Sequence, residues 1–201
     1  MENGRKTNNE RRLPDEGRLE KESPIEREKV MRLEWVPCDS PKDLAPNQIA
    51  QIMQLFLNET GERYAEASVR HLPIPTWGGN LMLIDTQAPA PQPILGVLWA
   101  TPFKEIIVRV AAFVIAAPHQ GQALGSQAWS MFTRAAWAHG YRHVQLEVKA
   151  ENERAQSFYQ RRGMEIKQPL TGYYQSGLGY MMRGPLEAPE FTKDYSPPQS
   201  G

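Results

Sequence analysis

The order of elements over residues 106–163 constrains the fold of this chain more than any other feature. An apolar strand, residues 106–116, runs into a glycine-containing turn that opens an amphipathic helix. A second strand, residues 143–149, follows and leads into a short helix that begins after Asn152 and ends at Gly163. Because the first strand is almost wholly apolar, we expect it to be central and covered on both faces. This order predicts a sheet with one crossover connection.

The segments on either side predict antiparallel pairs of strands. Apolar residues at helical spacing predict a helix over 46–61 closed by Gly61, with a second short helix within 62–71. Two strands joined by a long Pro-rich connection are expected before the crossover, and two more after it. Their ranges are 81–85, 93–103, 164–169 and 179–186. Helices and strands mixed in this way predict an α+β domain with a mixed sheet.

Composition excludes several classes of protein. The chain has 201 residues, which fits one domain, and 23 basic and 23 acidic side chains, so no global field favours nucleic acid or an acidic membrane. No apolar run approaches the ~20 residues that a membrane span needs. The single cysteine, Cys38, fits a reducing compartment, and its Pro-flanked setting predicts an inert thiol. We expect a soluble, cytoplasmic protein, monomeric or weakly dimeric.

The two ends of the chain differ from its middle. Residues 1–30 hold eight basic and eight acidic side chains and almost no large apolar ones, which predicts a disordered, charged tail. Residues 187–201 are Pro-rich and are expected to be flexible. The folded unit is therefore predicted to span 31–186. An alternative is that synthesis starts at Met31, where the first strand begins.

The turn at residues 120–126 predicts an anion site. Pro118 stops the strand and the helix begins at once, so several backbone N–H groups point at one position. The turn lacks the Lys-Ser/Thr of a Walker loop and the third glycine of a Rossmann fingerprint. Ordinary turn geometry is the alternative, but the strand–turn–helix context suits a pyrophosphate.

Glu147 and Tyr159 are the candidate acid/base pair. Taken singly, Glu147 fits a solvated strand position, Tyr159 a core anchor and Asn152 a helix cap. Taken together, a glutamate near the end of a strand and a tyrosine two turns into the next helix can face one cleft. The combination indicates an enzyme that transfers a group from a phosphate-bearing cofactor.

Two motifs resemble those of the GNAT superfamily of acetyl-coenzyme A-dependent N-acetyltransferases. Gln120-x-x-Ala123-x-Gly125 resembles its pyrophosphate loop, although Ala123 stands where a glycine is usual. Asn152-x-x-Ala155-x-x-Phe158-Tyr159 followed by Gly163 resembles its second cofactor motif. The resemblance implies a mixed α/β fold with a mostly antiparallel, twisted sheet, flanked by helices and opened by a V-shaped splay between two parallel strands.

Within the superfamily, the chain is most similar to protein N-terminal acetyltransferases, especially the bacterial type that modifies ribosomal-protein N-terminal alanine. Leu146-Glu147-Val148-Lys149 resembles their Leu-Glu-Val-Arg strand, with the same step from Glu to Tyr. The pair Tyr173-Tyr174, followed by Met181-Met182, resembles their penultimate loop. The acidic pair usual in that loop is missing from residues 175–179.

The resemblance also implies a mechanism. Acetyl-CoA would lie in the V, with its pyrophosphate on the turn, and would be attacked directly by an amine without a metal or a covalent enzyme intermediate. Glu147 would be the general base and Tyr159 the acid. A backbone N–H within 114–116 would stabilise the oxyanion, and Trp77, Tyr173 and Tyr174 would frame the acceptor pocket unless they only pack on one another. The implied cofactor contacts are Val114, Ile115, Ala116, Gln120, Gly121, Gln122, Ala123, Leu124, Gly125, Ser126, Asn152, Ala155 and Tyr159.

Three functions stay open from the sequence. The first is acetylation of protein N-termini, favoured by the Leu-Glu-Val-Lys step and the Tyr-Tyr pair. The second is acetylation of a small amine, favoured by the altered 175–179 loop. The third is a non-catalytic acyl-CoA sensor, favoured by Ala123, although a binder needs neither Glu147 nor Tyr159.

Overall fold

The structure is a computed structural model, and it describes Met1 and residues 31–75, 77–174 and 177–188. In these ranges seven strands form one sheet in the order β1-β2-β3-β4-β5-β7-β6, with helices packed against it. The strands are β1 Leu33–Pro37, β2 Leu81–Asp85, β3 Ile94–Lys104, β4 Ile107–Ile115, β5 His143–Lys149, β6 Glu165–Tyr174 and β7 Gly177–Pro185. The α-helices are α1 Pro46–Thr60, α2 Glu66–Arg70, α3 Leu124–Ala138 and α4 Glu153–Gln160, and short 3-10 turns lie at Pro41–Asp43 and Ala117–His119.

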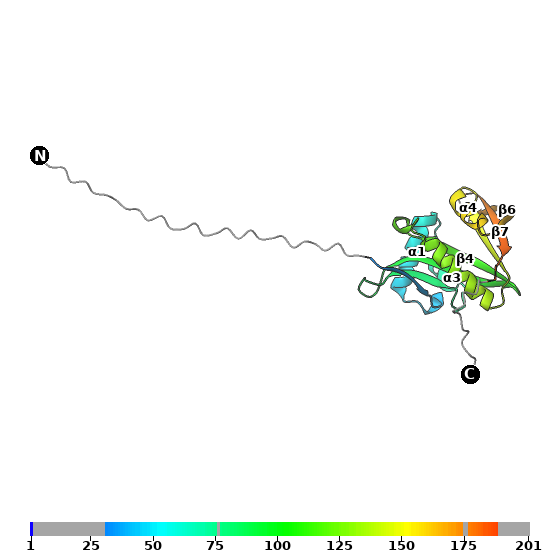
Figure 1. The fold of residues 1–201 in the computed structure, drawn as a ribbon, viewed down its shortest axis with the longest axis horizontal. Helices are drawn as coiled ribbons and strands as arrows, with labels where there is room; N and C mark the ends of the chain where they lie inside the picture. The colour runs from blue at the N-terminus through cyan, green and yellow to red at the C-terminus, as the bar shows by residue number, and fades with distance from the viewer. Residues whose placement is uncertain (2–30, 76, 175–176, 189–201) are drawn as a thin grey trace, which may run out of the picture. The chain divides into compact units, whose positions relative to one another are not determined.

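One pair of neighbouring strands, β4 and β5, runs parallel, and every other neighbouring pair in the sheet is antiparallel. The crossover between β4 and β5 contains α3, as parallel neighbours require. β4 is the middle strand, as its apolar sequence predicted, and the strand pairs on both sides are confirmed. In Figure 1, β4 lies in the middle of the domain, with α1 toward one side and β6 and β7 toward the other.

The first helix forms and stops where the sequence predicted. Pro46 opens α1 with its fixed φ. Gly61 ends it in the left-handed region at φ 72°, and the Gly61 N–H donates to Leu57 O at 3.0 Å. The buried face of α1, with Ile52 and Phe56, packs with Trp99 of β3 in one core cluster. α1 and α2 therefore cover one face of the sheet.

Helices α3 and α4 cover the other face, in a second core cluster. Phe132 of α3 and Tyr159 of α4 pack there with Leu146 and Val148 of β5. Because side chains alternate along a strand, Glu147 points to the opposite face, toward α1. The sheet thus has an α1–α2 face and an α3–α4 face. Glu147 lies on the first and Tyr159 on the second.

Trp77, predicted to frame the acceptor pocket, lies in the core. Its side chain is 9% exposed and packs in the α3–α4 core, with ring centroids 6.0 Å from Phe132 and 5.2 Å from His139. A Cβ at Gly79 would lie 2.7 Å from the indole, so this glycine gives the ring room to turn inward. The free energy gained by burying the large indole favours this inward position over the exposed loop position that the sequence suggested.

The inert character predicted for Cys38 agrees with its environment. The residue is 2% exposed, and the indole Nε1 of Trp99 donates to its Sγ at 3.2 Å. Burial raises the pKa of the Cys38 thiol to about 11, so almost no thiolate forms near neutral pH.

Among the described helices, none has the length and apolar character that crossing a membrane demands.

Candidate functional site

A cleft opens where β4 and β5 separate. Their ladder ends at the pair Val110 and Leu146, although β4 continues to Ile115 and β5 to Lys149. A cavity of about 620 Å³ lies along both strand ends and is lined by residues from α1, α2 and α4 as well. Backbone groups of the separated arms face this gap, so an extended ligand with amide groups could pair with them as a strand would.

A β-bulge lies at the point where the arms diverge. Trp99 of β3 is paired with Ala112 and Ala100 with Val110, which leaves Ala111 as the extra residue on β4. Bulges often occur next to active sites, where they redirect backbone groups. Beyond this bulge the pairing of β4 with β3 keeps a constant register from Ala112 to Ile115.

The direction of the backbone N–H groups at the end of β4 decides which of residues 114–116 can donate to an oxyanion in the cleft. The N–H of Ala116 donates to the carbonyl oxygen of Leu95 at 2.8 Å, so it is engaged with the β3 side. Because N–H groups alternate between the two sides of a strand, Val114 also points toward β3. Within 114–116, the N–H of Ile115 is the one directed to the cleft side.

Glu147 is the first residue of β5 beyond the ladder, and its side chain is 10% exposed. The Nε of Arg109 donates to both carboxylate oxygens, at 3.1 and 2.9 Å, and the second guanidinium nitrogen lies 2.6 Å from Oε2. The side-chain amide of Gln145 donates a longer hydrogen bond to Glu147 Oε1, at 3.4 Å. Arg183 in turn donates to Gln145 Oε1 at 2.6 Å and so orients this amide. The alternative of a solvated strand position does not hold, because these contacts fix the carboxylate in the cleft.

Tyr159 reaches the same cleft from α4. It is 7% exposed, and its ring packs 5.4 Å from Trp129 and 5.3 Å from Phe158, measured between centroids. Burial raises the pKa of its phenol well above the usual range, and the charge of Arg162 offsets only part of this effect. The hydroxyl is therefore protonated at physiological pH and can act as a hydrogen-bond donor.

The two candidate groups approach the cleft from opposite faces of the sheet. Tyr159 belongs to the α3–α4 core, whereas Glu147 lies on the α1 face. A ligand that reaches the gap from the α3–α4 face would meet Tyr159, and one from the α1 face would meet Glu147. This is the arrangement that a transfer between two substrates needs, with a proton acceptor on one side and a donor on the other.

The predicted anion turn has the geometry of a nest. Gly121 has φ 82° and Ala123 has φ 61°, so the chain curls before α3 begins at Leu124. In the described part of the chain, the N–H groups of residues 121–126 have no acceptor. Free N–H groups at the start of a 15-residue helix suit a phosphate, and this fits the pyrophosphate of coenzyme A.

Two arginines that sequence reasoning missed flank this turn. Arg154 donates to the side-chain oxygen of Gln120 at 2.9 Å, and Arg162 donates to Ser126 Oγ at 2.8 Å. Neither has a carboxylate within ion-pair distance among the residues the structure describes. Burial lowers the pKa of Arg162, and Arg161 lowers it further, so an anion here would relieve an unfavourable charge. The sequence could have indicated both arginines, because Arg154 lies within the Asn152–Tyr159 motif and Arg162 lies between this motif and Gly163.

Gln120 and Asn152 have structural contacts as well as places near the site. The Gln120 amide donates to Ile115 O at 2.7 Å and to Glu59 at 3.0 Å, which fixes the start of the turn. Asn152 caps α4, with its Oδ1 accepting from the N–H of Ala155 at 3.0 Å. Asn152 and Ala155 also line the cleft. The cap predicted as an alternative is therefore present, together with the position expected of a cofactor residue.

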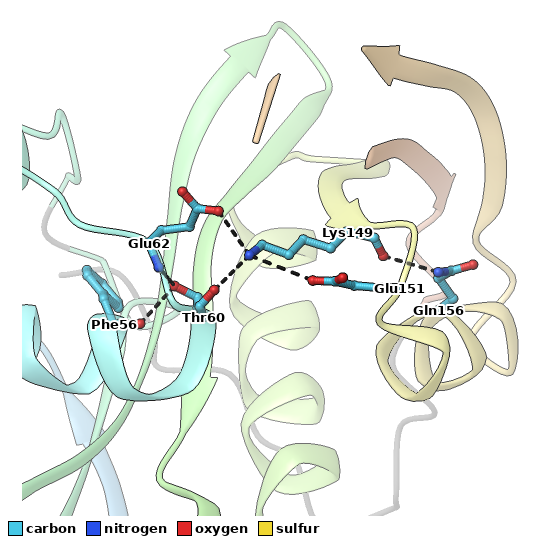
Figure 2. A network of polar contacts seen from close by, with 6 residues as sticks. All are labelled: Phe56, Thr60, Glu62, Lys149, Glu151 and Gln156. Atoms are coloured by element: carbon cyan, nitrogen blue, oxygen red, sulfur yellow. Dashed lines mark hydrogen bonds and ion pairs between the residues drawn. The ribbon is translucent and has the colours of Figure 1, made fainter. Parts of the chain in front are cut away.

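Of the residues predicted to frame an acceptor pocket, Tyr174 is the one that the described part of the chain places at the cleft. Tyr174 lines the cleft, whereas the side chain of Tyr173 and residues 175–176 lie outside the described part of the chain. Lys149 Nζ lies 5.6 Å from the Tyr174 ring and pairs with Glu62 at 2.9 Å (Figure 2). Glu62, from the α1–α2 connection, was not predicted, because nothing in its local sequence indicates a partner so distant in the chain.

Replacing Ala123 with glycine is expected to stabilise the folded protein. A non-glycine residue in the left-handed region costs about 1–2 kcal/mol, and a new glycine costs about 0.4–1 kcal/mol through the unfolded chain. The net gain in the free energy of unfolding should be about 0.5–1 kcal/mol. Urea denaturation followed by circular dichroism measures it.

Ala50→Gly is the matched control, because Ala50 is an exposed residue inside α1 in ordinary helical conformation. The same chemical change there should destabilise by about 0.5–1 kcal/mol. If both variants lose stability equally, Ala123 is not strained.

Comparison with known proteins agrees with this geometry. The sequence model described as the acetyltransferase (GNAT) family matches residues 49–164. Curated proteins give no match to this chain. Among solved structures, Ard1 from Thermoplasma volcanium aligns with a TM-score of 0.64 at 18% identity, over 78% of this chain and 99% of that one.

Two further structures share the fold. The ribosomal-protein-S18-alanine N-acetyltransferase from Escherichia coli aligns with a TM-score of 0.61 at 13% identity, over 82% of this chain and 99% of that one. A chain of the NatC complex, solved bound to Gag peptide and CoA, aligns with a TM-score of 0.66 at 17% identity, over 78% and 100%. The family match spans more than half of the chain and includes the anion turn and both candidate catalytic residues. The chain therefore belongs to the GNAT family and is an acetyltransferase that uses acetyl-CoA.

Proposed function

We propose that this enzyme transfers the acetyl group directly to the N-terminal α-amine of a protein or peptide. The observation that carries the proposal is the cleft between the separated arms of β4 and β5, with Glu147 and Tyr159 on its opposite sides. The N-terminal acetyltransferases among its structural neighbours support the choice of acceptor at the level of the fold.

The chemistry of amines favours the α-amine as acceptor. An amine must lose its proton before it can attack a thioester. An α-amino group with a pKa of about 8 is about one-tenth neutral at pH 7, whereas a lysine with a pKa of about 10.4 is neutral in fewer than about one molecule in a thousand. The free-energy cost of removing the amine proton at neutral pH is therefore lower for an N-terminus than for a lysine side chain, and a single glutamate suffices more easily as the base.

Each residue of the site has a proposed role. Bound acetyl-CoA supplies the acetyl group as an activated thioester. Glu147, held by Arg109 and Gln145, accepts the amine proton directly or through a water molecule. Tyr159 donates a hydrogen bond, and then a proton, to the departing sulfur. The backbone N–H of Ile115 stabilises the negative charge that develops on the carbonyl oxygen.

Direct transfer is favoured over an acetylated enzyme. The candidate acyl carrier would be Cys38, but it is 2% exposed, its pKa is raised by burial to about 11, and it does not line the cleft. We expect no acetylation of this residue during turnover. One buried cysteine also suits a reducing compartment such as the cytoplasm.

Release of free coenzyme A thiol from acetyl-CoA tests the proposal, with a peptide mixture and a panel of small amines as acceptors. Turnover with a peptide that begins with Ala or Ser, and mass spectrometry placing the acetyl group on its α-amine, is the expected result. Turnover with small amines alone would contradict the proposed acceptor and assign the enzyme to small-molecule acetylation.

A further inference from the structure

The ion pair between Lys149 and Glu62 is the least exposed in the described part of the chain. Lys149 Nζ lies 2.9 Å from Glu62 Oε1, and the two side chains are 14% and 9% exposed. The same ammonium group donates to the carbonyl oxygen of Thr60 at 2.7 Å and lies 4.0 Å from Glu151 (Figure 2). Such an enclosed pair holds its geometry more firmly than a surface pair.

The pair joins two separate walls of the cleft. Lys149 is the last residue of β5, on the arm that has left β4. Thr60 is the last residue of α1, the helix that packs against β3 and β4, and Glu62 follows it in the α1–α2 connection. Figure 2 shows the lysine side chain reaching across to this helix end. Lys149, Thr60 and Glu62 all line the cleft that contains Glu147.

Both ends of this connection are fixed by neighbouring hydrogen bonds. On the α1 side, Thr60 Oγ1 donates to Phe56 O at 2.8 Å and accepts from the Glu62 N–H at 3.1 Å. On the β5 side, Gln156 donates to the carbonyl oxygens of Lys149 and Ala150, at 3.2 and 2.8 Å. The C-terminal end of α1 also favours a cation through its dipole. The pair therefore fixes the α1–α2 connection relative to β5.

We infer that the Lys149–Glu62 pair positions the acceptor, by fixing the width of the entrance through which the amine reaches Glu147. This inference rests on the proposed function, because it requires an amine that arrives on the α1 face. Lys149 and Glu147 are two residues apart on the same strand face, or about 6.6 Å along β5. The part of the acceptor just behind its amine therefore passes the pair and the Tyr174 ring.

Three variants test the inference: Lys149→Met, Glu62→Gln and the double variant Glu62→Gln/Lys149→Met. Each single change leaves one buried charge behind, which destabilises the fold, whereas the double change removes both charges. In the double variant we expect the KM for an Ala-starting peptide to rise about tenfold, with kcat and the KM for acetyl-CoA changed less than about twofold. Steady-state kinetics and a thermal melt of each variant provide these values.

Glu165→Gln/Lys167→Met is the matched control, because this ion pair lies on β6 with both side chains well exposed. It should leave all kinetic constants at the wild-type values. A double variant at Glu62 and Lys149 whose acceptor KM equals that of wild type would overturn the inference and assign the pair to stability alone. A loss confined to kcat would also overturn it. Failure of the wild-type enzyme to acetylate the peptide is a different result, and contradicts the proposed function itself.

Discussion

Replacing Tyr159 with phenylalanine is expected to lower kcat about 10²-fold, while coenzyme A binding is kept. The phenol is buried against the cleft, and its raised pKa keeps it protonated, so the contribution that we propose for it is as a donor to the leaving sulfur. The substitution removes only the hydroxyl. The ring contacts with Trp129 and Phe158 remain, so the fold should be unaffected. Turnover is measured by thiol release and coenzyme A binding by calorimetry.

Tyr141→Phe is the control for this variant. Tyr141 packs beside Trp77 in the α3–α4 core, with ring centroids 6.0 Å apart, and it does not line the cleft. Loss of its hydroxyl should leave turnover at the wild-type value. Full activity in Tyr159→Phe would remove the tyrosine from the mechanism, and the sulfur would then have to leave as a thiolate or be protonated by solvent.

Glu147→Gln is expected to lower kcat/KM for the acceptor by a similar factor, about 10²-fold. Glutamine has nearly the same shape and keeps an oxygen that can accept from Arg109, but it cannot take a proton from an amine. The uncompensated charge of Arg109 should also reduce stability, so a thermal melt accompanies the kinetics. Coenzyme A affinity should not change, because Glu147 belongs to β5, whereas the anion turn lies between β4 and α3.

Glu165→Gln makes the same chemical change at an exposed carboxylate on β6 and should have no kinetic effect. If Glu147→Gln retained full activity, the amine would be losing its proton to another group. Activity that recovers in the variant at high pH, where the α-amine is already neutral, would instead support the role of Glu147 as base.

The elements of this fold could be predicted from the sequence because their signals are local. The helix α1 ends at Gly61, where only a residue tolerant of positive φ fits. The apolar alternation of Val144, Leu146 and Val148 indicated a strand with one buried face, and Asn152 marked the start of α4. The anion turn was also visible, because a strand that ends directly before a helix leaves N–H groups free.

Other features depend on contacts between distant parts of the chain. Arg109 and Glu147 are 38 residues apart, and Lys149 and Thr60 are 89 apart, so no local pattern could pair them. Trp77 was placed at the acceptor pocket because its neighbours are loop formers, yet the indole packs into the core beside Phe132. A breaker-rich sequence predicts where the backbone turns, but not which way a large side chain points afterwards.

The sequence by itself determined the order of strands and helices, the anion turn and the identity of the two candidate acid/base residues. The elements and the turn follow from backbone preferences and from the spacing of apolar residues, which act over a few positions. The two acid/base candidates follow from their combination on a strand and the next helix, and from the resemblance of the surrounding motifs to those of the GNAT superfamily. Only the tertiary structure decided which polar side chains became partners: Arg109 for Glu147, and Glu62 for Lys149. Charged groups interact through space, so their pairing depends on how β4 and β5 diverge and on where α1 ends, and both are set by the packing of the whole domain.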